Sequence, residues 1–359
     1  MVAGRVIILS VPQDTHAHAM CEAIERKGGE VAVYYTTDFP ERLGLTIRPA
    51  RPSAALAAHG PLRRELGAEW SAVWLRRTWF STAPAAFEES DRAIIERECR
   101  QMRRSFLALL CPSAFWVNPL HRQEPSKPAQ LVAALRCGFQ VPRTLASNEP
   151  SEILAFVRAA PGPVVFKTFC SLAPTTVVTE EMLAEPDLLR WTPGIYQHYV
   201  EKNYEVRVTV VGSRLFGVRI NSQATARGTI DWREAQRSPG GRPSDLTLET
   251  VVLPRFVEAC CQRLMRSLGL VFGTIDLIVT PTRKQVFLEV NAAGQFLFVE
   301  AETGVPVLDA LSQMLLEGRR DYAWDSGSPS VRFDSAFEGA VEARQAKAMA
   351  EHVADPRPW

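Results

Sequence analysis

Two acidic side chains and one amide in the later part of the chain have the types and spacing of a metal site. Asp276 lies in the segment "GTIDLIVT", and Glu289 and Asn291 lie in "FLEVN". Both segments are typical of β-strands, in which residues two apart share a face. Glu289 and Asn291 are therefore expected to point the same way, and Leu288 and Val290 the other way.

The segment "PTRK" between these strands predicts a hairpin. If its turn is centred between Thr282 and Arg283, Asp276 lies directly across from Glu289, and two like charges so placed destabilise the strand pair. A magnesium ion suits this position because it prefers hard oxygen ligands and is usually held by one or two carboxylates together with substrate phosphates. Asn291 offers a further oxygen. An amphipathic hairpin with a solvated polar face explains the same alternation.

Other polar residues favour an anionic ligand that would complete such a metal shell. Lys167 ends the apolar strand "PVVFK", and Lys127 lies in the first turn of a helix, where a cation is unfavourable with the helix dipole. The segment "QHYVEKNYEVRV" places Gln197, Glu205 and Arg207 at the polar positions of a strand. Each of these, taken alone, also fits a solvated lysine or an ordinary amphipathic strand.

Composition excludes several classes of protein. The 359 residues, 46% hydrophobic and 23% charged, predict two or three domains. A formal charge of +1 provides no overall field for nucleic acid or an anionic membrane. Seven scattered cysteines without CxxC spacing fit neither a disulfide framework nor a zinc site, and the N-terminal apolar run is too short for a signal sequence. We therefore expect a cytoplasmic protein that binds neither nucleic acid nor a membrane.

The hydrophobic pattern predicts an α/β fold class with three structured parts. Residues 1–118 open with strand, helix and strand in "RVIILSV", "THAHAMCEAIERKGG" and "EVAVYY", which indicates an open α/β domain. Residues 119–194 read as a small α+β unit, and residues 195–325 as a mixed sheet with a helix. Residues 326–359 begin with Gly, Ser and Pro, so we expect a poorly ordered tail with at most one helix.

In this order of parts the chain resembles the ATP-grasp superfamily, from about residue 5 to residue 320. A narrower set of segments resembles the microviridin-type ligases, which make graspetides by joining side chains of a ribosomal precursor peptide. These segments are "TTDFP", "VWLRR", "NP", "KPAQLVAALRCGFQVPRTLASNEP", "VEKNYEVRVTVVG", "INSQ", "DWR", "FGTIDLIVT" and "FLEVNAAGQF". The chain departs from that family in lacking Pro after Asn291, Trp at Phe296 or Phe298, and glycines in the loop after Lys167.

The resemblance implies a set of nucleotide contacts, with ATP and Mg²⁺ as cofactors. Lys127 and Lys167 would hold the ATP phosphates from two sides, and Glu205 would bind the ribose hydroxyls. Arg207 and Arg233 would act as catalytic residues that steady the γ-phosphate or an acyl phosphate. The backbone facing the adenine edge would come from Gln197, His198, Tyr199 and Val200. The metal ligands would be Asp276, Glu289 and Asn291.

Candidate substrate residues come from two places. Arg77 follows a strand of the first domain, where in this architecture the substrate lies against the ATP cleft, although arginines there also form structural salt bridges. The segment "INSQATARGTIDWRE" either presents hydrogen-bond donors to a peptide or forms a solvated hairpin. The resemblance implies that it receives the leader segment of the precursor peptide. Its candidate residues are Ser222, Gln223, Asp231 and Trp232.

The function implied by the resemblance is an ATP-dependent carboxylate ligase. It would form ω-ester or ω-amide crosslinks in a precursor peptide through an acyl phosphate and release ADP and phosphate. The sequence contains no GxSxG, Walker A or HExxH motif, which agrees with a mechanism that needs no covalent nucleophile from the protein. A RimK-like ligase that adds a free amino acid, or a non-catalytic precursor-binding relative, remains an alternative. A homodimer is also compatible with the resemblance, although the sequence identifies no interface.

Overall fold

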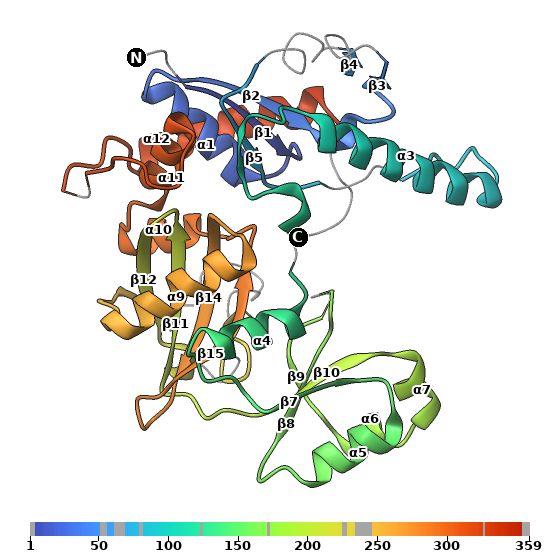
Figure 1. The fold of residues 1–359 in the computed structure, drawn as a ribbon, viewed down its shortest axis with the longest axis vertical. Helices are drawn as coiled ribbons and strands as arrows, with labels where there is room; N and C mark the ends of the chain where they lie inside the picture. The colour runs from blue at the N-terminus through green and yellow to red at the C-terminus, as the bar shows by residue number, and fades with distance from the viewer. Residues whose placement is uncertain are drawn as a thin grey trace.

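The structure is a computed structural model in which several short segments are not described. The described residues are 4–50, 56–60, 69–78, 82–122, 125–170, 173–224, 228–233, 246–325 and 327–353. They form a parallel sheet near the N-terminus, two antiparallel sheets farther along the chain, and a small β-hairpin. In Figure 1 the parallel sheet lies at the top, the larger antiparallel sheet at the lower left and the smaller one at the lower right. This arrangement confirms the predicted mixed α/β fold class.

The N-terminal sheet is parallel and is covered on both faces. Its strands, in the order β2-β1-β5-β6, are β1 (Arg5–Ser10), β2 (Glu30–Tyr35), β5 (Ala72–Leu75) and β6 (Phe115–Val117). Val6 and Ile8 of β1 share a hydrophobic core with α1 (Thr15–Arg26) and α11 (Val307–Glu317). Ile7 and Leu9 pack into a second core with α3 (Glu89–Leu109) on the opposite face. Burial on both faces explains the uninterrupted apolar run of β1.

Short elements complete this part of the molecule. The small hairpin pairs β3 (Gly44–Ile47) with β4 (Leu56–His59). The 3₁₀ turns are η1 (Thr36–Asp38) and η3 (Leu120–Arg122).

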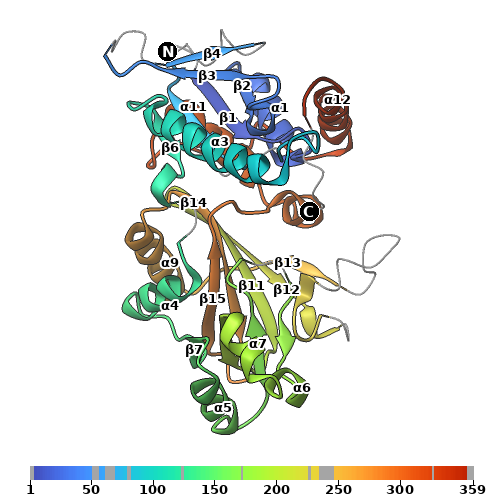
Figure 2. The ribbon, with the colours of Figure 1, turned by 90° about the vertical axis from the view of Figure 1, so that its right-hand side faces the viewer.

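The C-terminal tail returns to the N-terminal domain. Helix α12 spans Ser335–Glu351 and packs against α1, and its Phe337 and Val341 are fully buried in the core shared with β1. Figure 2 shows α12 beside α1 at the edge of the parallel sheet. The one helix that the sequence allows in this tail is therefore present and packs against the N-terminal domain. Residues 354–359 lie outside the described part of the chain.

The central part is a four-stranded antiparallel sheet with helices. Its strands, in the order β7-β10-β8-β9, are β7 (Thr144–Ser147), β8 (Val164–Lys167), β9 (Thr176–Val177) and β10 (Gly194–His198). Ile153, Leu183 and Leu189 form its core together with Val164 and Tyr196. Its helices are α5 (Pro150–Arg158), α6 (Glu180–Leu183) and α7 (Pro186–Trp191).

The larger antiparallel sheet has one apolar and one polar face. Its strands, in the order β13-β12-β11-β14-β15, are β11 (Tyr204–Val211), β12 (Arg214–Ile220), β13 (Leu248–Thr250), β14 (Phe272–Val279) and β15 (Gln285–Asn291). Val206 and Val208 of β11 pack with α4 (Lys127–Arg136) and α9 (Arg255–Leu268) on the apolar face. The alternate residues Glu205 and Arg207 therefore project from the other face. Two short elements, η4 (Ser222–Ala224) and α10 (Leu297–Thr303), flank the sheet.

The hairpin of β14 and β15 contains an irregularity that the sequence does not reveal. Asp276 pairs with Glu289, as predicted, but the register shifts after Asp276 so that Leu277 pairs with Phe287. Leu288 is thus the extra residue of a β-bulge. It lines a cleft together with Glu289 instead of facing the core with Val290, which corrects the predicted direction of Leu288.

No described helix combines the length and apolar character needed to cross a membrane.

Glu300 on α10 is an acidic residue in an apolar environment. It is 4% exposed, and its Oε2 accepts a hydrogen bond of 2.8 Å from the amide of Leu308. Burial raises its pKa from 4.5 to about 8. Because the folded protein retains a proton that the unfolded chain releases at lower pH, the stability that Glu300 contributes is lost as pH rises through this range.

Replacing Glu300 with Gln should remove this pH dependence. We expect the E300Q variant to exceed the wild type in free energy of unfolding by on the order of 3 kcal/mol at pH 8, with little difference near pH 5. Urea unfolding at both values measures it. Glu302, exposed on the same helix, provides the control variant E302Q. An equal difference at both pH values would contradict the prediction.

Candidate active site

A cleft between the two antiparallel sheets gathers most of the candidate residues. Its walls include the ends of β8 and β10, the polar face of β14 and β15, and the start of α4. The predicted site residues that line it are Lys127, Lys167, Gln197, His198, Tyr199, Val200, Glu205, Asp231, Trp232, Arg233, Asp276, Glu289 and Asn291. Arg77, Arg207, Ser222 and Gln223 are predicted site residues that do not line it.

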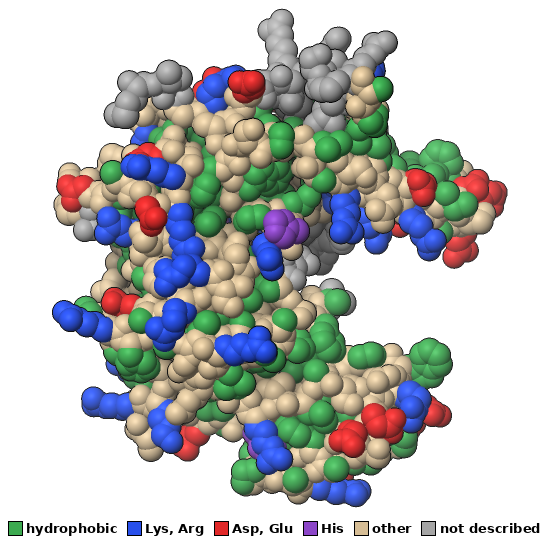
Figure 3. Space-filling view, viewed as in Figure 1, with side chains coloured by type: hydrophobic (Ala, Val, Ile, Leu, Met, Phe, Trp, Pro, Cys, Tyr) green, Lys and Arg blue, Asp and Glu red, His purple; other side chains and the backbone are tan. Residues whose placement is uncertain are grey.

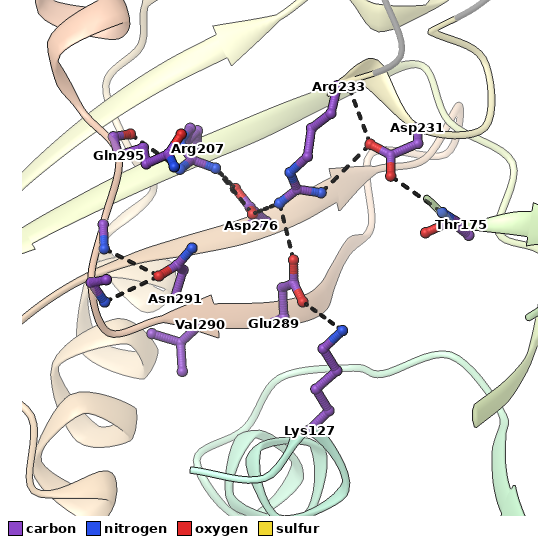
Figure 4. Close-up of polar contacts among 12 residues, drawn as sticks. Lys127, Thr175, Arg207, Asp231, Arg233, Asp276, Glu289, Val290, Asn291 and Gln295 are labelled. Carbon is purple, nitrogen blue, oxygen red and sulfur yellow. Dashed lines mark hydrogen bonds and ion pairs between the residues drawn. The ribbon is translucent and has the colours of Figure 1, made fainter. Parts of the chain in front are cut away.

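The two carboxylates of the hairpin share a cation. One nitrogen of Arg233, Nη2, donates to Oδ2 of Asp276 at 2.9 Å and to Oε1 of Glu289 at 3.0 Å (Figure 4). Burial alone would raise the pKa of Glu289, but Arg233 and two neighbouring lysines hold it below its ordinary value. The position between the carboxylates, where the sequence predicts a positive charge, is thus taken by a guanidinium group.

Arg207 acts on Asp276 from within the sheet. It is 3% exposed, and its Nη1 lies 2.7 Å from Oδ1 and 3.1 Å from Oδ2 of Asp276. Its guanidinium group is 5.5 Å from the ring centre of Trp232 and 5.7 Å from that of Phe298. In this structure Arg207 orients Asp276 and does not itself line the cleft, which differs from the direct phosphate contact expected of it.

The hairpin offers two carboxylates that fit a magnesium ion. Asp276 and Glu289 face each other with hard oxygen atoms and already share a cation. Asn291 directs its Oδ1 to the amides of Ala293 and Gly294, at 3.0 and 3.2 Å, and so closes the turn after β15. Within the described residues, no group of three or more His, Cys, Asp or Glu side chains is arranged to hold a metal. A ligand with its own oxygens would have to complete the shell.

Two lysines enter the cleft from separate elements. Lys127, at the start of α4, donates to the carbonyl of Thr168 at 3.1 Å and lies 3.8 Å from Oε2 of Glu289. Lys167, at the end of β8, is in a desolvated environment that lowers its pKa, an effect that the charge of Glu289 opposes. Together they place positive charge on the side of the cleft that faces the acidic hairpin, as an anionic ligand requires.

A third lysine was missed from the sequence. Lys202 is 7% exposed, pairs with Glu205 at 2.8 Å and donates to the carbonyl of Ile230 at 3.1 Å. Burial raises the pKa of Glu205, which Lys202 and the hydroxyl of Ser222 oppose. The only signal in the sequence is a lysine three residues before a strand glutamate, a spacing that is common on protein surfaces.

Apolar side chains form another part of the cleft wall. Val165, Ile278 and Leu288 line it beside the backbone that follows β10. That backbone is fixed by two hydrogen bonds, from the amide of His198 to Arg143 and from the amide of Tyr199 to Pro163. A flat aromatic ligand would find apolar side chains and backbone groups together here, an arrangement typical of small-molecule sites.

The segment proposed to receive a leader peptide is largely buried. Trp232 is 3% exposed and stacks on Phe298, and Ser222 is fully buried. Asp231, 8% exposed, accepts hydrogen bonds from the amides of Arg233 and Thr175, at 3.1 and 3.5 Å. Trp232 and Asp231 therefore belong to the wall of the cleft, Ser222 does not line it, and none of the three is an exposed side chain. Residues 225–227 and 234–245 of this region lie outside the described chain.

The remaining candidates lie outside the cleft. Gln223 donates to the hydroxyl of Ser222 at 3.2 Å. Arg77, after β5, is 3.7 Å from the buried carboxylate of Asp14 in the N-terminal domain. Its neighbour Arg76 is closer to the same carboxylate, at 3.2 Å.

Comparison with known proteins agrees with this geometry. Residues 5–124 match the family described as the MvdD pre-ATP grasp domain. The macrocyclase MdnC from Microcystis aeruginosa, solved with its precursor peptide MdnA, is 27% identical and superposes with a TM-score of 0.75 over 87% of this chain and 99% of its own. The chain is an ATP-grasp ligase and is similar to the graspetide macrocyclases. The resemblance found in the sequence is thereby confirmed.

Two further solved structures share the fold of this ATP-grasp ligase. A RiPP-associated ATP-grasp ligase from Chryseobacterium gregarium, in complex with ADP and a leader and core peptide, is 24% identical with a TM-score of 0.74, covering 90% of this chain and 100% of its own. The ligase PsnB, complexed with minimal precursor, Mg and ADP, is 21% identical with a TM-score of 0.71, covering 87% and 96%. No match was found among curated proteins.

If Arg233 takes the place of a metal ion, removing it should strengthen metal binding without nucleotide. We expect the R233M variant to bind Mn²⁺ about tenfold tighter than the wild type near neutral pH, because an opposite charge this close stabilises a carboxylate by at least that factor. Electron paramagnetic resonance of free Mn²⁺ measures the affinity. The R233K variant retains the charge and should remain near the wild type. Unchanged or weaker binding by R233M would show that the guanidinium does not compete.

Proposed function

We propose that this ligase uses ATP and Mg²⁺ to form ω-ester or ω-amide crosslinks between side chains of a ribosomally made precursor peptide. The observation that carries the proposal is the opposition of Asp276 and Glu289 in a cleft that also receives Lys127 and Lys167. Related macrocyclases and ligases with this fold were solved with precursor peptides, and some with ADP and Mg.

Each wall of the cleft has a role in binding ATP under this proposal. Asp276 and Glu289 would hold Mg²⁺, which when bound neutralises charge on the phosphate oxygens. Lys127 and Lys167 would contact the phosphates from α4 and β8. Glu205, kept in place by its pair with Lys202, would accept the ribose hydroxyls. The adenine would lie against the apolar part of the cleft wall. The proposed contacts there are the backbone of Gln197, His198, Tyr199 and Val200.

The chemistry follows from the weakness of a carboxylate as an electrophile. Transfer of the γ-phosphoryl group of ATP to an Asp or Glu side chain of the peptide gives an acyl phosphate and ADP. A Thr or Ser hydroxyl, or a Lys amine, of the same peptide then attacks the carbonyl carbon and phosphate leaves. Each ring therefore lowers the mass of the peptide by one water. The protein positions the reacting groups and balances their charge.

Residues around the acidic pair support this step without forming a covalent bond. Arg207 keeps Asp276 oriented, and Arg233, which reaches both carboxylates, would be free to contact the transferred phosphoryl group once a metal ion replaces it. The contact between Thr175 and Asp231 joins the loop after β8 to the segment after η4. Figure 3 shows the molecule hollowed between its N-terminal and central parts, which leaves room for a peptide to approach.

Product mass tests the function directly. The enzyme would be incubated with ATP, Mg²⁺ and the peptide encoded beside its gene, expected to carry Thr, Ser or Lys together with Asp or Glu. We expect release of ADP and loss of one water per ring. Gain of an amino acid residue would instead support the RimK-like ligase. Absence of ATP turnover in the presence of a bound peptide would support a non-catalytic binder.

Removing one charge of the acidic pair should abolish most activity while the fold is kept. The E289Q variant leaves the buried pair of Arg207 and Asp276 intact, so we expect a normal thermal midpoint. Its kcat/KM for crosslinking should fall by roughly a thousandfold, the scale of several kcal/mol of lost metal polarisation. The D187N variant, altered on the exposed helix α7, should keep full activity. Crosslinking by E289Q at the wild-type rate would exclude Glu289 from the site.

A further inference from the structure

The turn that follows β15 is held in one conformation by its own residues. Asn291 accepts hydrogen bonds from the amides of Ala293 and Gly294. Gly294 has φ of +51°, and a Cβ atom there would lie 2.9 Å from the ring of Phe272 and 3.1 Å from Oγ1 of Thr274. Only glycine adopts this conformation at such close approach without strain. The backbone directly beyond Glu289 is therefore tightly constrained.

Three side chains of the N-terminal domain form hydrogen bonds with the backbone at this turn. Asn118, after β6, donates to the carbonyls of Phe272 and Ala292, at 2.8 and 3.0 Å. Arg76, after β5, donates to the carbonyl of Ala293 at 2.7 Å. His16, in the first turn of α1, accepts from the amides of Phe296 and Leu297 at 3.1 and 3.3 Å, although it lies 280 residues from Phe296 in the chain. These side chains come from the carboxyl edge of the parallel sheet.

The buried carboxylate of Asp14 lies beside both Arg76 and His16. Asp14 is 2% exposed, accepts a hydrogen bond from the hydroxyl of Ser10 at 2.7 Å, and lies 3.2 Å from Nε of Arg76 and 3.7 Å from Nδ1 of His16. Burial would raise its pKa, but Arg76 and His16 hold it well below the ordinary value. Burying these charged groups costs free energy. An apolar contact would hold the two domains together as firmly.

The chemistry of His16 matches its contacts. Burial lowers the pKa of this side chain to about 4, so the ring is neutral at neutral pH. A neutral ring can accept the two amide hydrogen bonds at Nε2 only when its proton is on Nδ1, the nitrogen nearer Asp14. The negative charge of Asp14, 3.7 Å from Nδ1, favours the tautomer that can hold the turn.

We propose that His16 is a positioning residue for the metal site, acting through the turn that leads away from Glu289 and Asn291. Groups behind metal ligands fix ligand orientation, and their loss typically lowers metal affinity by about tenfold to a hundredfold. The parallel sheet of the N-terminal domain thereby sets the geometry of a metal site on another sheet. This inference rests on the proposed function, because it requires that Glu289 binds a metal ion with the nucleotide.

His18 provides a matched control on the same helix. It is fully buried two residues after His16, but its Nε2 lies 2.6 Å from the carbonyl of Pro12 within the N-terminal domain. A variant at His18 should disturb the packing of α1 without reaching the turn. A purely structural role for His16 predicts that variants at the two histidines behave alike.

The experiment measures ADP affinity by calorimetry with Mn²⁺ and, separately, with a chelator. We expect the H16L variant to bind Mn²⁺–ADP about tenfold more weakly than the wild type, with its affinity for metal-free ADP within about twofold. The H16Q variant carries an acceptor oxygen near the position of Nε2 and should recover most of the loss. The H18L variant should lower the thermal midpoint and leave the gain in ADP affinity from Mn²⁺ unchanged.

Two results would overturn the inference, and they differ from failure of the proposed function. If H16L retains the full gain from Mn²⁺, or if H18L loses as much of it as H16L, His16 does not position the metal site. If the wild type itself gains no ADP affinity from Mn²⁺, the metal site proposed at Asp276 and Glu289 fails first, and the role of His16 fails with it.

Discussion

The arrangement of the molecule depends on balancing two carboxylates, one buried and one partly buried, that stand opposite each other in the cleft. Asp276 and Glu289 occupy paired positions of β14 and β15, where their mutual repulsion would destabilise the hairpin. Arg207 holds the first from within the sheet, Arg233 bridges both, and Lys127 approaches the second from α4. Removal of water from such a site strengthens every one of these interactions.

The site lies between the two antiparallel sheets, and the parallel sheet supports it from behind. The larger antiparallel sheet supplies the acidic pair, and the central sheet brings Lys167 and the backbone after β10 to the opposite wall. The parallel sheet contributes no cleft residue among the described positions that line it, yet Asn118, Arg76 and His16 hold the turn beyond β15. Helix α12 packs on α1 and so supports the helix that carries His16.

The acidic pair of the cleft could be predicted from local sequence because strand alternation is a local property, whereas the roles of His198, Tyr199, Val200 and Arg233 came from the family resemblance. A turn centred between Thr282 and Arg283 predicts Asp276 opposite Glu289, and the structure confirms this pair. The turn is centred slightly earlier than assumed, and the bulge at Leu288 compensates for the difference. A single inserted residue leaves no mark in the pattern of polar and apolar residues, so the direction of Leu288 was predicted wrongly.

Contacts between distant segments could not be predicted in the same way. The sequence around Trp232 is typical of an exposed loop, but in the structure Phe298 packs against its ring. Arg233 reaches the acidic pair although it lies 43 positions before Asp276 in the chain. The sequence of the tail allows at most one helix, and that helix, α12, buries only Phe337, Val341 and Ala348. Such packing is decided by the partner surface, which one segment does not encode.

Anomalous diffraction from crystals grown with Mn²⁺ and ADP tests most directly whether the acidic pair binds a divalent cation. The structure predicts a metal peak between Asp276 and Glu289, at about 2 to 2.3 Å from a carboxylate oxygen of each, with Arg233 withdrawn from the position it now holds. A metal peak elsewhere, or Arg233 still bridging both carboxylates beside a bound nucleotide, would contradict it.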